Sequence, residues 1–128
     1  MRNGIVNHGF TLIEILVVLT IIGVLLSLVT PRYFDSIDRS KETVLRHDLQ
    51  VMRNAIDHYV SDRNAYPDAL EDLVEAHYLR AVPVDPITDR KDTWILVAPE
   101  DAFYEGNIAD VHSGSEQMAS DGSLYVEW

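Results

Sequence analysis

An apolar stretch near the N-terminus, residues 10–29, most constrains what this chain can fold into. Its length is about the 20 residues that one helix needs to cross a bilayer at 1.5 Å rise per residue. It contains one formal charge, Glu14, close to its start. Ionisable groups inside membrane spans are costly and usually functional. The sequence therefore predicts a transmembrane helix whose single carboxylate has a specific partner.

The segments flanking this stretch indicate that the span is retained. The polar leader, residues 1–9, has one basic side chain, Arg2, and no small-x-small cleavage signal follows the span. The positive-inside tendency places the leader in the cytoplasm and the remainder of the chain outside. Pro31 lacks an amide hydrogen and clashes with the preceding turn, so we expect it to kink, loosen or break the helix there.

Composition limits the remaining function classes. The 128 residues suffice for one domain beyond the span. The net charge of −11 lies entirely on residues 31–128, which carry nine basic and 20 acidic side chains. Such a surface repels nucleic acid and anionic headgroups, so no nucleic-acid partner is expected. Cation binding and plain solubility both remain compatible with this charge. The absence of cysteine excludes disulfides and thiolate chemistry.

The motif Gly9-Phe10-Thr11-Leu12-Ile13-Glu14, followed by an apolar helix, resembles the N-terminal signature of type IV pilins and type II secretion pseudopilins. The resemblance implies cleavage between Gly9 and Phe10 by a prepilin peptidase, followed by N-methylation of Phe10. It divides the chain into a leader (1–9), a transmembrane half of the N-terminal helix (10–30) and a periplasmic pilin-like domain (31–128). Pro31 falls where members of this family often carry a helix-breaking proline.

This resemblance suggests a partner for Glu14. In a staggered bundle of identical helices, the free amine of Phe10 on one subunit reaches Glu14 on its neighbour. A charge-assisted pair in a low-dielectric bundle is strong only when both members are present, so Glu14 would set the register of assembly. The alternative is a charge tolerated near the bilayer edge.

The soluble part predicts an α+β fold. An amphipathic helix follows the span, with an apolar stripe facing a core, while three apolar side chains of its nearer half are candidates for contacts between subunits. Asp68 and Glu71 resemble a capping box that opens a short helix. Segments 93–98, 107–112 and 123–127 read as antiparallel strands, the last preceded by an Asp121-Gly122 turn. The stripe consists of Leu45, Leu49, Met52, Ile56 and Tyr59, and the subunit-contact candidates are Tyr33, Phe34 and Ile37.

The order of these elements also resembles the major pseudopilin of type II secretion. The shared landmarks are Tyr66-Pro67, Tyr78-Leu79 and Pro83-Val84-Asp85-Pro86. Members of that group often bind calcium in the loop between the last two strands, here residues 113–120. The resemblance implies that Asp121, Asp110 and Ser113 are calcium ligands. The alternative is a loop closed by ordinary hydrogen bonds, and Ile87-Thr88 stands where the family usually has an aromatic-Gly pair.

No enzymatic motif appears. The five histidines lack a metal-ligand spacing, and the chain has neither a phosphate-binding glycine loop nor a Gly-x-Ser-x-Gly elbow. We therefore expect a non-enzymatic, single-pass inner-membrane subunit that polymerises into a pseudopilus for type II secretion. The resemblance implies minor pseudopilins and inner-membrane secretion components as partners. The alternatives are a type IV pilus subunit for adhesion or motility and a monomeric membrane-anchored binding module.

Overall fold

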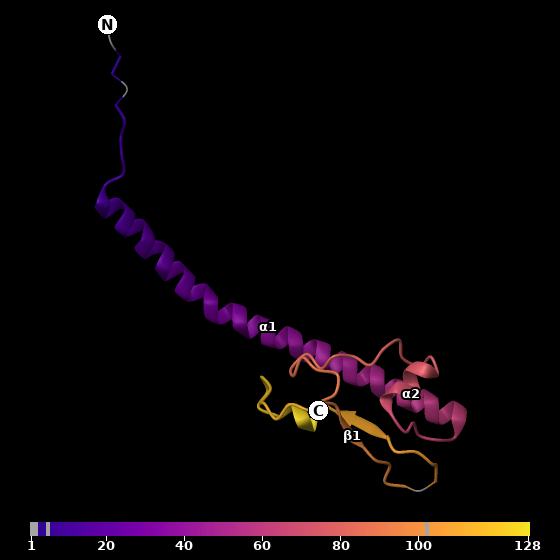
Figure 1. Cartoon of the computed structure of the whole chain (residues 1–128). Helices are drawn as coiled ribbons and strands as arrows, with labels where there is room; N and C mark the ends of the chain where they lie inside the picture. The colour runs from indigo at the N-terminus through magenta and orange to yellow at the C-terminus, as the bar shows by residue number, and fades with distance from the viewer. Residues whose placement is uncertain (1–2, 5, 102) are drawn as a thin grey trace. The chain divides into compact units, whose positions relative to one another are not determined.

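The computed structural model describes residues 3, 4, 6–101 and 103–128, so Met1, Arg2 and Ile5 of the expected leader lie outside the described residues. Contacts divide the chain into two units, residues 1–37 and 38–128. The division falls seven residues after the expected end of the transmembrane half at residue 30. Helix α1, Leu12–Arg63, contributes to both units (Figure 1).

In the first unit, the described residues before Leu12 have no regular secondary structure. Helix α1 then continues through Pro31, so the predicted helix break is not an interruption of the helix. A proline removes only one amide donor, here the one that would bond the carbonyl of Ser27, and the helix continues on both sides of it. A bend or local loosening at Pro31 remains a prediction.

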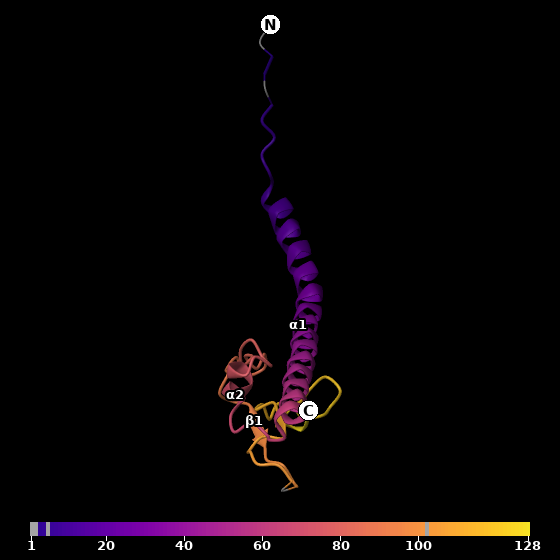
Figure 2. The same cartoon turned by 90° about the vertical axis from the view of Figure 1, so that its right-hand side faces the viewer.

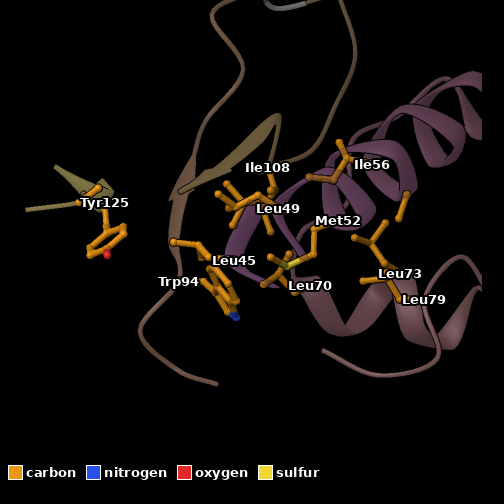
Figure 3. Close-up of a cluster of buried hydrophobic side chains, with 13 residues drawn as sticks. Leu45, Leu49, Met52, Ile56, Leu70, Leu73, Leu79, Trp94, Ile108 and Tyr125 are labelled. Atoms are coloured by element: carbon orange, nitrogen blue, oxygen red, sulfur yellow. The ribbon is translucent and has the colours of Figure 1, made fainter. Parts of the chain in front are cut away.

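In the second unit, the apolar stripe of α1 packs into a core, as the sequence predicts. Leu45, Leu49, Met52 and Ile56 are all at most 2% exposed. Figure 3 shows their side chains converging with those from the rest of the unit. Full burial of such a side chain contributes about 1.5–3 kcal/mol. The other labelled members of this cluster are Leu70, Leu73, Leu79, Trp94, Ile108 and Tyr125.

Helix α1 ends at Arg63, and Asn64 follows with φ 52°, a left-handed conformation that commonly terminates helices. Helix α2, Leu70–Glu75, has Ala69 at its N-cap. The Asp68–Glu71 capping box is not formed. The carboxylate of Asp72 accepts instead from the amides of Asp68 (2.9 Å) and Ala69 (3.0 Å). The carboxylate of Asp68 accepts instead from the side-chain amide of Asn107 at 3.0 Å.

The sheet has two antiparallel strands, β1 (Ile95–Val97) and β2 (Asp110–His112), with Leu96 opposite Val111. Both are shorter than the predicted segments. Trp94 leaves the ladder because its indole Nε1 donates to the carbonyl of Pro83 at 2.8 Å. Figures 1 and 2 place α2 and β1 beside the C-terminal part of α1.

The predicted third strand at 123–127 is wrong. Only one bridge, Met118 to Leu124, forms, and Tyr125–Glu127 is a 3₁₀ turn. The predicted turn at Asp121-Gly122 is present, with Gly122 at φ 86°. It directs the chain toward α1, where the hydroxyl of Tyr125 donates to Glu42 at 2.9 Å. Segment 123–127 is therefore attached to α1 through this side-chain bond and does not pair as a third strand.

Candidate functional site

The start of α1 joins the residues of the N-terminal motif in a reciprocal pair of hydrogen bonds. The amide of Glu14 donates to the hydroxyl of Thr11 at 3.2 Å, and the amide of Thr11 donates to a carboxylate oxygen of Glu14 at 3.4 Å. This is a capping box, in which a threonine and a glutamate three residues later satisfy each other's free helix-end amides. The Thr-x-x-Glu spacing was the sequence signal for it, and our sequence interpretation did not use that signal.

The Gly9–Phe10 bond lies just before this cap. Both residues are outside regular secondary structure and exposed, Phe10 by 80%. A Cβ built on Gly9 would meet no atom within 4 Å. The Gly9–Phe10 peptide bond is therefore exposed in this structure. The residue after it, Thr11, is the one whose amide donates to the carboxylate of Glu14.

The first half of α1 is long and apolar enough to cross a membrane, judged by length and composition. Its apolar side chains are exposed within the structure, and its hydroxyl groups are satisfied inside the helix. Thr20 donates to the carbonyl of Leu16 at 2.8 Å and Ser27 to that of Val24 at 2.7 Å. Internal satisfaction of polar groups is what a lipid environment requires.

A second group of interest joins α1 to the C-terminal loop. Glu42 of α1 is buried beneath this loop, with 8% of its surface exposed. Its carboxylate accepts from the amide of Ser120 at 2.7 Å, from the hydroxyl of Ser120 at 2.6 Å and from Tyr125. Sequence reasoning missed Glu42, which it grouped with the mostly polar near half of the helix. Nothing in its neighbourhood in the sequence points to a partner 78 residues away.

The sequence analysis identified Asp85 only as a loop residue shared with the pseudopilins. In the structure its side chain is fully buried. It accepts from the hydroxyl of Ser113 at 2.6 Å and from the amide of Ile87 at 2.9 Å. The loop after β2 is therefore attached to the rest of its unit at both ends, to Asp85 near its start and to Glu42 near its end.

Comparisons with known proteins assign the family. A family model described as a prokaryotic N-terminal methylation motif matches residues 6–30. The chain is 39% identical over 96 residues to the type II secretion system core protein G of Pseudomonas aeruginosa, covering 62% of this chain and 68% of that protein. It is 36% identical over 102 residues to the protein of the same name from Escherichia coli, covering 67% and 70%. The chain belongs to the core protein G family. No solved structure matches it significantly.

Membership in the core protein G family confirms the resemblance drawn from the N-terminal motif. The family comprises the major pseudopilins of type II secretion, which are structural proteins. The apolar half of α1 is consistent with membrane anchoring in this family.

In this member of the core protein G family, the three side chains that the resemblance implied as calcium ligands are each hydrogen-bonded to other groups of the chain. Asp110 accepts from Arg53 Nε at 2.8 Å, and Ser113 donates to Asp85. Asp121 accepts from the amide of Ser123 at 3.0 Å. Among the residues that the structure describes, no three His, Cys, Asp or Glu side chains are grouped to hold a metal ion. Calcium takes six to eight oxygen ligands, and these three side chains alone do not supply that number.

The hydrogen bonds that join Glu42 to Ser120 and Tyr125 predict that the stability of the fold decreases at both acid and alkaline pH. Burial raises the pKa of Glu42, but the hydrogen bonds from Ser120 and Tyr125 outweigh it and hold that pKa below its ordinary 4.5. Burial, together with the bond to Glu42 and the charges of Glu42, Asp38 and Asp121, raises the pKa of Tyr125 from 10.0 to about 12. The contribution of Glu42 is thus complete above its ordinary pKa and lost as pH falls through the lowered one. That of Tyr125 is complete below pH 10 and lost as pH rises toward 12.

We therefore expect urea unfolding of the full chain in detergent to show falling stability below about pH 4.5 and above about pH 10. The alkaline loss should be about 2–3 kcal/mol. Tyr125→Phe is the matched control, since it keeps the ring and removes the titrating hydroxyl. A Tyr125→Phe variant with the same alkaline loss as the parent would assign that loss to other tyrosines.

Proposed function

We propose that this chain is the major structural subunit of a pseudopilus, which polymerises from the inner membrane and drives protein export by type II secretion. The observation that carries the proposal is the accessible Gly9–Phe10 bond placed directly before a capped apolar helix that bears Glu14. Family membership supports the same role, because the relatives are named as core proteins of the type II secretion system.

The first step in this proposal is processing. A prepilin peptidase cleaves between Gly9 and Phe10, and Phe10 is N-methylated. Cleavage creates an α-amine one residue from the Thr11–Glu14 cap. The leader and the active site of the peptidase lie on the cytoplasmic side, while residues 31–128 form the periplasmic domain.

The second step is assembly. The carboxylate of Glu14 leaves its weak intrachain partner, the 3.4 Å bond from the Thr11 amide, for the charged amine of a neighbouring subunit. A charge-assisted bond in a low-dielectric bundle is stronger than this one. The contact joins two different surfaces, and the repetition of such a contact extends a helical fibre when it does not close on itself.

Fibre growth from the membrane then pushes folded cargo toward an outer-membrane channel. The chain's contribution is mechanical and not enzymatic. Its partners are further copies of itself, minor pseudopilins and the inner-membrane components of the secretion machinery.

The proposal is tested by deleting the gene and restoring it in the native bacterium. We expect deletion to retain type II cargo in the periplasm and the restored chain to release it, with a mature N-terminus at methylated Phe10 by mass spectrometry. A mature chain that begins elsewhere, or secretion that continues without the gene, would contradict the proposal. Loss of surface pili with unchanged secretion would favour a type IV pilus subunit.

A further inference from the structure

We propose that Glu42 closes the C-terminal loop of this chain as an internal anion, so that the loop folds and holds its shape without calcium. The proposal departs from the calcium site that resemblance to the pseudopilins implies, and it does not depend on the proposed function. It follows from where the loop's hydrogen-bond donors point and from what already neutralises its carboxylates.

The donors of the loop converge on Glu42. One carboxylate oxygen accepts from the Ser120 amide and from Tyr125, and the other accepts from the Ser120 hydroxyl, all within 2.9 Å. Glu42 and Tyr125 are 8% and 5% exposed. Charge-assisted bonds of this length to a buried carboxylate are among the stronger hydrogen bonds in proteins. A cation at this position would face N–H and O–H hydrogens rather than lone pairs.

The start of the loop is held in the same way. The buried carboxylate of Asp85 accepts from the Ser113 hydroxyl, whose oxygen in turn accepts from the Ser115 amide at 3.3 Å. Between the two attachments, the Ala119 amide donates to the Ser123 carbonyl at 2.7 Å. Among the described residues, no buried side-chain nitrogen or oxygen lacks a hydrogen-bond partner. The described part of the loop therefore presents no buried side-chain oxygen that lacks a hydrogen-bond partner.

The two aspartates that flank the loop have cationic neighbours. Asp110 pairs with Arg53 at 2.8 Å, and Asp121 lies 3.6 Å from Arg46. Arg53 also donates to the carbonyls of Val111 (2.9 Å) and Trp128 (2.8 Å). A guanidinium group therefore lies beside each of these two carboxylates, and a divalent ion there would meet repulsion.

The first experiment compares thermal unfolding of the full chain in detergent with millimolar calcium and with EDTA, followed by tryptophan fluorescence. Trp128 reports on the loop directly, since its indole donates to Ser123 at 2.7 Å and its ring lies 5.1 Å from that of Tyr125. We expect the two midpoints to agree. A calcium site loaded a hundredfold above its dissociation constant would raise the midpoint by about 10 °C or more. Such a rise would overturn the proposal.

The second experiment compares Glu42→Gln with Glu116→Gln under EDTA. Both changes remove one negative charge, but Glu116 is an exposed residue of the same loop. We expect Glu42→Gln to lower the midpoint by about 5–15 °C and Glu116→Gln to leave it unchanged. Amide hydrogen exchange at residues 118–125 should accelerate at least tenfold in Glu42→Gln alone.

Should Glu42→Gln fail to fold, Ser120→Ala removes one bond and retains the amide donor. We then expect a midpoint lower by a few degrees and faster exchange confined to the same residues. Equal midpoints for Glu42→Gln and Glu116→Gln, or a Ser120→Ala variant indistinguishable from the parent, would overturn the assignment of Glu42.

Discussion

Replacing Glu14 with glutamine should abolish fibre formation while leaving the chain cleaved and inserted in the membrane. Glutamine retains the cap, since a capping box accepts Gln as well as Glu at this position. It removes the negative charge that we propose pairs with the amine of a neighbouring Phe10. An unpaired charge in a low-dielectric environment costs about 3–5 kcal/mol, or a contact weaker by roughly 10²- to 10⁴-fold for each subunit added. The effect on a polymer is therefore all or none.

The measurement is cross-linking and electron microscopy of fibres from cells that overproduce the chain, with N-terminal mass spectrometry for processing. Thr11→Ala is the matched control, because it removes the threonine half of the cap and leaves the charge of Glu14. We expect that variant to form fibres. Normal fibres from Glu14→Gln, together with none from Thr11→Ala, would make helix capping the only role of Glu14.

Replacing Gly106 with alanine should unfold most of the second unit. Gly106 has φ 122°, and a Cβ there would lie 2.1 Å from the carbonyl oxygen of Tyr66. The backbone cannot retreat, because the amide of Tyr66 donates to the carbonyl of Glu105 at 2.7 Å and the amide of Ile108 donates to that of Pro67 at 3.0 Å. Strained φ and overlap with backbone atoms together cost about 3–5 kcal/mol, a large part of the stability of a domain this size.

Gly122→Ala distinguishes the cost of positive φ from the cost of steric overlap. Gly122 also has positive φ, 86°, but a Cβ there meets nothing within 4 Å. We expect about 1–2 kcal/mol of destabilisation for it, from conformation alone. Urea unfolding followed by circular dichroism checks both variants. Equal losses in the two would show that the close approach of residues 66–67 to 105–108 contributes nothing.

Local patterns predicted the parts of this fold that local physics determines. The stripe from Leu45 to Ile56 repeats at three- and four-residue steps, so its buried face was evident before any tertiary contact was known. The N-terminal motif predicted the family for the same reason, since all its residues are contiguous.

The errors arose where the structure is decided by contacts between distant residues. Segment 123–127 has the composition of a strand, yet the bond from Tyr125 to Glu42 draws it into a turn. The sequence predicts Asp68 as part of a helix cap, but in the structure its carboxylate accepts a hydrogen bond from Asn107, 39 positions away. The partners of Asp110 and Ser113, which are Arg53 and Asp85, were likewise not visible from the loop sequence alone.

The contacts of Trp128 decide where a probe can be attached. Its carbonyl oxygen accepts from Arg53 and lies in hydrogen-bonding contact with the ring of His112, and its indole is bound to Ser123. A fluorescent protein or affinity tag fused directly after Trp128 would strain these contacts. Phe103, 87% exposed in the β1–β2 loop, offers a better position. Since the chain has no cysteine, Phe103→Cys would give a single thiol for labelling.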